Sequence, residues 1–159
     1  MVHDRSVRFD HPANRPLIKY LKRGWDGSRP ENVSAPPTVY DLHRNCLGTH
    51  PDLADRLWKE ICTRLPEECG WVVYGRPALV HARTGIIFAF GGGTHTYALR
   101  LPAGTRAEAR KVSPRRVVSY PGTQSRFDLD LDQLGEEWIL GGWFQDEESW
   151  CLAAYVFAG

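Results

Sequence analysis

The sequence lacks long apolar runs and a strong excess of charge of either sign. No apolar stretch is long enough to span a bilayer, and the N-terminal residues lack the apolar core of a signal peptide. The formal net charge of +1 provides no overall attraction to nucleic acid or to an anionic membrane. We therefore expect a soluble, cytoplasmic protein of bacterial type, without a membrane partner, whose four cysteines are reduced thiols.

The common catalytic motifs are also missing. The chain contains no G-x-S-x-G, H-E-x-x-H, Walker loop or dinucleotide fingerprint. A catalytic pair such as Cys46 with His95 stays open, because catalytic groups assemble in space rather than along the sequence. The sequence therefore favours a non-enzymatic function without excluding an enzyme.

The composition is that of a folded protein. Hydrophobic residues make up 42% of the 159 positions and charged residues 25%, which is enough apolar material for one core. We expect a single α+β domain over residues 41–159, preceded by an irregular, Pro-rich N-terminal arm over residues 1–40. Five prolines interrupt regular structure in that arm: Pro12, Pro16, Pro30, Pro36 and Pro37.

Two segments have the pattern of helices that cover a sheet. The first spans residues 51–65, where Pro51 suits the first turn and apolar residues recur at every fourth position. The second spans residues 146–158, with Asp146 as its cap. The side chains expected on their buried faces are Leu53, Leu57, Ile61 and Leu65 in the first helix, with Trp58 beside them, and Trp150, Ala154 and Phe157 in the second.

Between these helices lie four short runs rich in β-branched and aromatic residues. Turn formers separate them, and the connections "HARTG" and "GGG" have the length of hairpin turns. These features predict an antiparallel meander as the centre of the fold, with "RRVVSY", "RFDLDL" and "EWILGGW" as candidates for further strands. The four runs are "WVVYG", "PALVH", "GIIFAF" and "THTYALRL".

Three consecutive glycines, Gly91 to Gly93, raise the question of a phosphate-binding loop. Such a loop needs a following helix N-terminus or a Lys-Ser/Thr pair. The residues that follow, "THTYALRLP", contain neither and favour a strand. We therefore interpret the glycines as a hairpin turn, in which their tolerance of positive φ is useful.

Zinc ligands occur just before the first expected helix. His43, Cys46 and His50 have the spacing H-x2-C-x3-H, and Cys62 or Cys69 can supply a fourth ligand. Paired ligands at both ends, the usual pattern, are missing, and Cys62 lies beside the apolar stripe, where a thiol acts as a small hydrophobe. We expect no cofactor, with zinc at this cluster as the alternative.

Two other histidines, His81 and His95, fall at opposite ends of the expected strand over residues 86–90. The rise along a strand separates them by roughly 14 Å or more, so they cannot share one metal ion. Each is expected to be a core or rim histidine with a hydrogen-bond partner.

Charged residues fall into two adjacent blocks of opposite sign. From Arg100 to Arg126 there are seven basic residues and one acid, whereas residues 127–159 contain eight acids and no Lys or Arg. The blocks either neutralise each other within the fold or offer a charged surface to a partner. The residues assigned to candidate binding surfaces are Arg106, Arg110, Lys111, Arg115 and Arg116 in the basic block, and Asp128, Asp130, Asp132, Trp138 and Trp143 in the acidic block.

Each charged set also has an interpretation without a ligand. The three aspartates alternate with leucines, as on a solvated strand face, and the segment lacks the Gly and Glu of a calcium loop. The basic segment "RAEARKVSPRR" has no interleaved aromatic residues, so it is expected to be a solvated loop unless it contacts phosphates.

The segment "VVYGRPALVHARTGIIFAFGGGTHTYALRLP", together with the helix expected before it, resembles the helix and meander of small TfoX N-terminal and YjbR-like domains. In those domains a short G-x-P strand leads into a strand bearing "FA" and then into one that ends in a Leu/Lys-rich run. The resemblance covers residues 50–102. It implies a small α+β binding module with nucleic-acid or regulatory roles, and it brings no catalytic residue to this chain.

Three functions from different classes remain as hypotheses. The leading one is a non-enzymatic protein-interaction module of the immunity, inhibitor or regulatory type, favoured by the two-signed charge, the six tryptophans and the missing catalytic motifs. The second is a zinc-binding domain or metal-dependent enzyme that uses His43, Cys46 and His50. The third is a nucleic-acid-binding protein that uses residues 106–116. The identity of the partner and the oligomeric state stay open.

Overall fold

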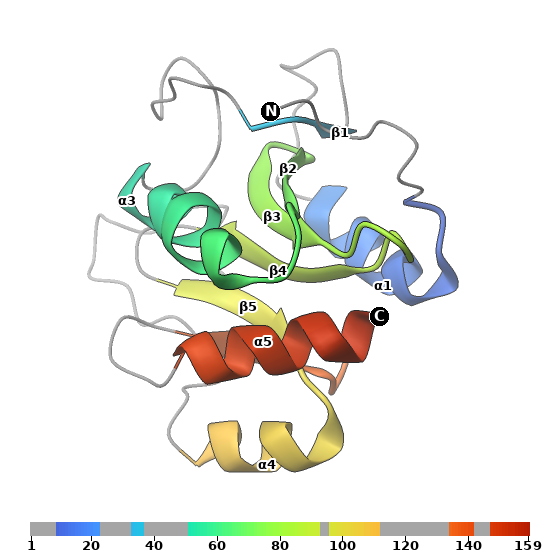
Figure 1. Ribbon diagram of the computed structural model, residues 1–159. Helices are drawn as coiled ribbons and strands as arrows, with labels where there is room; N and C mark the ends of the chain where they lie inside the picture. Colours follow the sequence, from blue (N-terminus) through green and yellow to red (C-terminus); the bar gives the residue numbers. More distant parts are fainter. Residues whose placement is uncertain (1–8, 23–32, 37–50, 93–95, 112–133, 142–146) are drawn as a thin grey trace, which may run out of the picture.

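Figure 1 shows the computed structural model of the chain, which describes residues 9–22, 33–36, 51–92, 96–111, 134–141 and 147–159. Within these residues one six-stranded sheet has the order β1-β2-β3-β4-β5-β6, and each strand pairs antiparallel with the next. The predicted α+β class and antiparallel meander are confirmed. The strands are β1 (Val33–Ser34), β2 (Gly70–Val73), β3 (Arg76–Val80), β4 (Ile87–Gly92), β5 (Thr96–Arg100) and β6 (Trp138–Gly141).

Short connections explain the meander. Tyr74 and Gly75 join β2 to β3, and both have positive φ, 47° and 77°, as a two-residue turn of this kind requires. Gly91 pairs with Tyr97 and Gly92 with Thr96, so residues 93–95 connect β4 to β5. The predicted hairpin is therefore present, but the first two of the three glycines extend the strand rather than form the turn.

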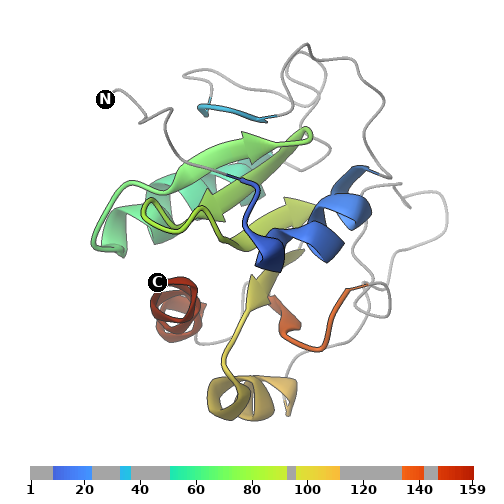
Figure 2. The ribbon, with the colours of Figure 1, turned by 90° about the vertical axis from the view of Figure 1, so that its right-hand side faces the viewer.

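The sheet is buried on both faces. One face packs against α3 (Pro51–Asp55), η3 (Arg56–Ile61), η4 (Cys62–Arg64) and α5 (Glu147–Ala158), and the other packs against α1 (Arg15–Leu21). Figure 2 shows α1 and α5 on opposite sides of the sheet. Every residue of β2, β3 and β4 is consequently buried, which explains their nearly continuous apolar sequences.

A bulge in β4 alters the simple alternation of faces. Leu79 pairs with Ala89 but Val80 pairs with Ile87, so the partner strand has one extra residue, Phe88. As a result Phe88 and Ala89 both pack on the face that α5 covers, whereas Ile87 and Phe90 pack on the face that α1 covers.

The expected irregular arm contains a helix, which corrects the prediction for residues 15–21. Leu17, Tyr20 and Leu21 recur at helical spacing and are buried against the sheet. Just before this helix, the buried side chain of Asn14 donates to Gly85 O (2.8 Å) and accepts from Ile87 N (2.9 Å). Tertiary contacts therefore order a segment that its prolines had marked as irregular.

The helix predicted over residues 51–65 is confirmed from Pro51 to Arg64, and Leu53, Leu57 and Ile61 are buried as expected. Its middle part, η3, has the wider hydrogen bonding of a π-helix, which the spacing of apolar residues did not indicate. The predicted second helix is confirmed as α5. Its Phe157 is 37% exposed, which corrects the expectation that this side chain is buried.

One further helix was not expected. Residues Ala103–Arg110 form α4, where the sequence had indicated a solvated loop, and the buried side chain of Ala109 anchors the helix to the core. The segment "EWILGGW" contains β6, as proposed for a further strand, whereas "RRVVSY" and "RFDLDL" lie outside the described residues.

Candidate functional site

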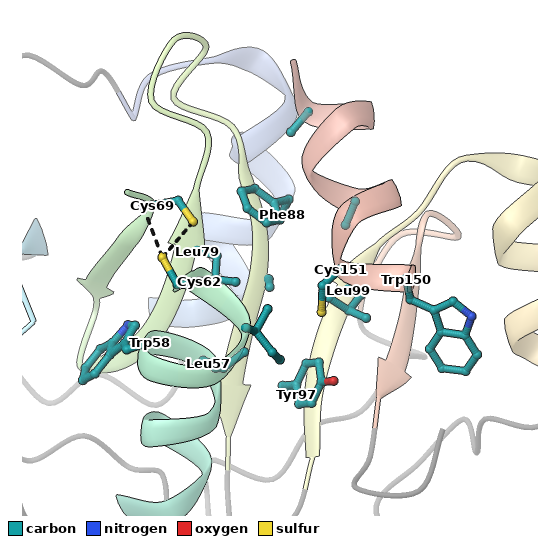
Figure 3. Packing of buried hydrophobic residues seen from close by; sticks show 14 of the residues in the cluster. Leu57, Trp58, Cys62, Cys69, Leu79, Phe88, Tyr97, Leu99, Trp150 and Cys151 are labelled. Carbon is teal, nitrogen blue, oxygen red and sulfur yellow. Dashed lines mark hydrogen bonds between the residues drawn. The ribbon is translucent and has the colours of Figure 1, made fainter. Parts of the chain in front are cut away.

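Helix α5 carries its only charged residues, Glu147 and Glu148, at its first two positions. From Ser149 to Gly159 the sequence contains no charged residue. Trp150, Cys151, Ala154 and Ala158 are buried on the inner side of α5, within the core cluster that includes the sheet (Figure 3). An ordinary surface helix would carry polar residues on the opposite side. This departure from the usual pattern directs attention to the outer side of α5.

The outer side of α5 carries three large apolar side chains in contact with solvent. Leu152 is 47% exposed, Val156 65% and Phe157 37%. They border a hollow of about 720 Å³. We call its lining the α5 surface, and it consists of Pro102, Ser149, Leu152, Ala153, Val156 and Phe157.

A second, smaller hollow lies on the other side of Leu152. It measures about 230 Å³ and is bounded by the end of the helical segment 51–64 and by α5. Ser149 and Leu152 line both hollows, so Leu152 forms a ridge between them. The described residues that complete the smaller hollow are Ile61, Arg64, Leu65 and Cys151.

An arginine lies beside each of the two hollows, and the one at the larger hollow is paired with a carboxylate. Among the described residues that line the larger hollow none is charged, but the guanidinium of Arg100 lies 4.3 Å from the centre of the Phe157 ring. Arg64 lines the smaller hollow. The Nε of Arg100 also donates to Glu137 Oε2 at 2.7 Å, so this arginine is held in place over Phe157.

A polar cluster attaches the inner side of α5 to the sheet. The hydroxyl of Tyr155 donates to Glu67 Oε1 at 2.8 Å, and its ring stacks on His81 with 4.8 Å between ring centres. Thr84 Oγ1 donates to Ala158 O at 2.8 Å. These contacts hold the C-terminal half of α5 in one orientation, and its outer apolar side chains are therefore presented on a fixed support.

The titration behaviour of this cluster follows from its burial. Desolvation lowers the pKa of His81, whose Nδ1 accepts hydrogen bonds from the backbone N–H groups of Arg83 (3.2 Å) and Thr84 (3.4 Å). Desolvation, together with the hydrogen bond to Glu67, raises the pKa of Tyr155 to about 12. The expectation that His81 has a hydrogen-bond partner is confirmed. Both groups are neutral near pH 7, which fits a structural attachment.

Two buried thiols lie side by side next to this cluster (Figure 3). Cys62 Sγ and Cys69 Sγ are 3.1 Å apart, and the backbone N–H of Cys69 donates to Cys62 Sγ at 3.4 Å. The hydrogen bond between the two side chains is the main cause that lowers the pKa of Cys62, and the same contact raises the pKa of Cys69. The sequence had indicated reduced thiols, with Cys62 and Cys69 as possible further zinc ligands. Only the helix-to-strand spacing Cys-x6-Cys could have suggested that they meet.

Trp138, assigned from the sequence to a binding surface, is a core residue. Its side chain is 5% exposed and packs edge-on against Phe90, with 5.3 Å between ring centres. Trp138 and Arg106 both line a hollow of about 400 Å³, so a contact of Trp138 with a partner stays a prediction. Trp143 and the three aspartates Asp128, Asp130 and Asp132 lie outside the described residues.

The described part of the basic segment lies on α4 and at its end. Arg106 is partly exposed, whereas Arg110 and Lys111 are exposed. Arg110 donates to Glu136 O, and Lys111 Nζ lies 3.1 Å from Glu108 Oε1. Together with Arg100 and Glu137, these contacts show that the basic and acidic blocks partly neutralise each other. Arg115 and Arg116 lie outside the described residues.

The zinc hypothesis rests on residues that lie outside the described part of the chain. His43, Cys46 and His50 are all among them. Among the residues that are described, no group of three or more His, Cys, Asp or Glu side chains could hold a metal ion. The sulfurs of Cys62 and Cys69 lie close together, and the other three expected ligands are outside the described residues. A zinc site at these residues stays a prediction.

Within the described residues, no helix is both long enough and apolar enough to cross a membrane. The chain was also compared with protein-family models, curated proteins and solved structures, and none of the three comparisons found a match. The resemblance to TfoX N-terminal and YjbR-like domains stays a prediction. Among the described residues, the α5 surface is the feature that bears most directly on function.

Proposed function

We propose that this chain is a protein-binding module and that its α5 surface receives an amphipathic helix of a partner protein. The observation that supports this proposal is the exposure of Leu152, Val156 and Phe157 around one hollow, on a helix whose residues from Ser149 onward are uncharged. Contiguous apolar patches on soluble proteins commonly mark interaction sites. This assignment keeps the interaction role inferred from the sequence but moves it from the tryptophans and charges to α5.

The lining favours a protein segment over a small molecule. Sites for small ligands combine an apolar wall with several polar groups that fix the orientation of the ligand. Among the described residues that line the larger hollow, only Ser149 has a polar side chain. Two hollows separated by the ridge of Leu152 suit side chains that project from successive turns of a helix, as in helix-in-groove recognition.

The charge beside the surface specifies the chemistry of the partner. Arg64 lies at the smaller hollow, and Arg100, although paired with Glu137, lies at Phe157, so acidic side chains flanking the apolar side of the partner helix would be favoured over basic ones. A helix is also favoured over a second copy of this chain. The 12 residues of α5 span about 18 Å, and a stripe of this length covers much less than the roughly 800 Å² per partner of a standard interface.

A direct test uses two synthetic helical peptides of about four turns. Both carry Leu at positions i, i+4 and i+7, and the flanking positions are Glu in one peptide and Lys in the other. We expect the Glu peptide to bind more tightly than the Lys peptide in fluorescence anisotropy, and Val156→Asp to weaken its binding by tenfold or more, about 1.4 kcal/mol.

The matched control is Ala107→Asp on α4, an exposed position that lines neither of the two hollows. It introduces the same charge and should leave binding of the Glu peptide unchanged. Equal loss in both variants, or equal binding of the two peptides, would contradict the proposed surface.

A further inference from the structure

The pair Cys62 and Cys69 has the geometry of a dithiol that can close to a disulfide. The two Sγ atoms are 3.1 Å apart, and a disulfide bond is about 2.05 Å long, so closure needs a displacement of about 1 Å. Cys62 begins η4, and Cys69 directly precedes β2. Of the residues that connect them, Thr63, Arg64, Pro66 and Glu68 are exposed. This short surface connection can absorb such a shift without disturbing the sheet.

The two sulfurs differ in their surroundings, which assigns each a separate role. Cys62 Sγ receives the backbone N–H of Cys69 at 3.4 Å and lies 3.1 Å from the Cys69 thiol. Both contacts stabilise a thiolate at Cys62 and outweigh burial and the Glu68 carboxylate, whose Oε1 lies 3.9 Å from Cys62 Sγ, so the pKa of this group is lowered. Cys69 has 0% exposure and a raised pKa, so it stays protonated until its partner has reacted.

We propose that Cys62 is a hydroperoxide-oxidisable thiol and that Cys69 is its resolving partner, so that the pair forms a reversible intramolecular disulfide. In the first step the Cys62 thiolate attacks one oxygen of a hydroperoxide, ROOH. The O–O bond breaks, Cys62 becomes a sulfenic acid, and the alkoxide leaves as ROH after taking a proton.

The second step closes the ring. The Cys69 thiol gives up its proton and attacks the Cys62 sulfur, the S–S bond forms, and the S–O bond breaks with release of water. Two thiols and one hydroperoxide thus give one disulfide, one alcohol and one water. A dithiol reductant such as dithiothreitol reverses the reaction by thiol–disulfide exchange.

Burial restricts the oxidant to a small molecule. Cys62 is 3% exposed and Cys69 is not exposed, so a protein disulfide cannot reach either sulfur in the folded state. Hydrogen peroxide is small enough to enter through local opening of the exposed 63–68 connection. This inference is independent of the peptide-binding proposal, because neither thiol lines the α5 surface or the smaller hollow beside it.

The test treats the reduced, full-length protein with hydrogen peroxide and then blocks free thiols before digestion with trypsin. Cleavage after Lys59, Arg64 and Arg83 separates the two cysteines into peptides 60–64 and 65–83, because trypsin does not cleave the bond between Arg76 and Pro77. We expect a disulfide-linked pair of these two peptides, which dithiothreitol separates. A link from Cys62 to Cys46 or Cys151, or no link at all in the folded protein, would overturn the proposal.

Variants test the separate roles. Cys69→Ser should accumulate a sulfenic acid at Cys62, which dimedone traps as an adduct on peptide 60–64. Cys62→Ser should lose both the adduct and the linked peptides, whereas the control Cys151→Ala should retain the link. The two single variants can also be compared directly. If dimedone labels Cys69 in Cys62→Ser as strongly as it labels Cys62 in Cys69→Ser, the assignment of roles is overturned. Circular dichroism checks that each variant is folded. A disulfide link that forms only after unfolding in urea would also contradict the proposal.

Discussion

The helical segment 51–64 and helix α5 cover the same face of the sheet but differ on their outer sides. The outer side of segment 51–64 is charged, with Arg56 paired to Glu60 at 2.6 Å and Lys59 paired to Asp55 at 3.1 Å. The outer side of α5 is apolar, with Leu152, Val156 and Phe157 exposed. Both helices contribute to one core cluster, so the difference does not concern the folding of this chain. It indicates that the outer side of segment 51–64 faces solvent, whereas the outer side of α5 is suited to contact with a partner.

The largest effect expected from this comparison concerns inner and outer leucines. Leu57 has 0% exposure, and Leu57→Ala should lower the free energy of unfolding by about 2–5 kcal/mol through lost contacts and a residual cavity. Leu152→Ala removes the same atoms from a side chain that is 47% exposed. This variant should lower the free energy of unfolding by only about 0.5 kcal/mol. Urea denaturation measures both. Comparable losses would mean that Leu152 supports the core and would remove the distinction.

A smaller effect is expected at the attachment of α5 to the sheet. Tyr155→Phe keeps the ring that stacks on His81 but removes the hydroxyl that donates to Glu67 at 2.8 Å. The variant should lose about 0.5–1.5 kcal/mol of stability, the usual net value of one hydrogen bond. Thermal and urea unfolding provide the measurement. An unchanged stability would show that stacking alone attaches this part of α5.

Making the outer side of α5 resemble that of segment 51–64 should have a still smaller effect on stability. The double variant Leu152→Glu, Val156→Lys introduces an acid–base pair at i,i+4, which contributes about 0.2–0.5 kcal/mol to a helix. We expect the free energy of unfolding to change by no more than about a few tenths of a kcal/mol. Binding of the Glu-flanked peptide should be lost. A large loss of stability in this double variant would instead show that the two exposed side chains stabilise the fold.

The weakest expected effect is a dependence of stability on pH at His81. Burial lowers the pKa of His81 in the folded protein, so the unfolded chain binds more protons once the pH falls below the unfolded value of about 6.5. The stabilisation from neutral His81 is therefore fully present above that pH and is lost as the pH falls toward the folded value. NMR titration of the imidazole should give a pKa below 6.5. A higher value would show that Glu67, with Oε1 3.8 Å from His81 Nε2, dominates instead.

Local sequence patterns predicted the sheet and the two main helices because each pattern reflects a strong local preference. Short β-branched runs separated by turn residues predicted β2 to β5, and the fourfold apolar repeat predicted the segment from Pro51 to Arg64. Two helices were missed because their formation depends on contacts with distant residues. Helix α1 is buried against the sheet through Leu17 and Leu21, and α4 is held by the buried Ala109.

The candidate site was less predictable than the fold. Phe157 was expected on the buried side of α5 together with Trp150 and Ala154, because the three share a helical spacing. The spacing of apolar residues does not predict the buried side of a helix whose residues from Ser149 onward are uncharged. Packing against the sheet decided which of its residues point outward. The approach of Cys62 to Cys69 was missed for a related reason, since it depends on the path of the chain between a helix and a strand.

The sequence by itself determined the α+β class, the antiparallel order of β2 to β5, and the helices over residues 51–64 and 147–158. It did so because hydrophobic periodicity and turn residues act over a few positions of the chain. Only the tertiary structure decided which side of α5 faces solvent, that Trp138 is buried, and that two thiols lie 3.1 Å apart. These features depend on which surfaces the sheet leaves available, a property of the whole fold rather than of any local segment.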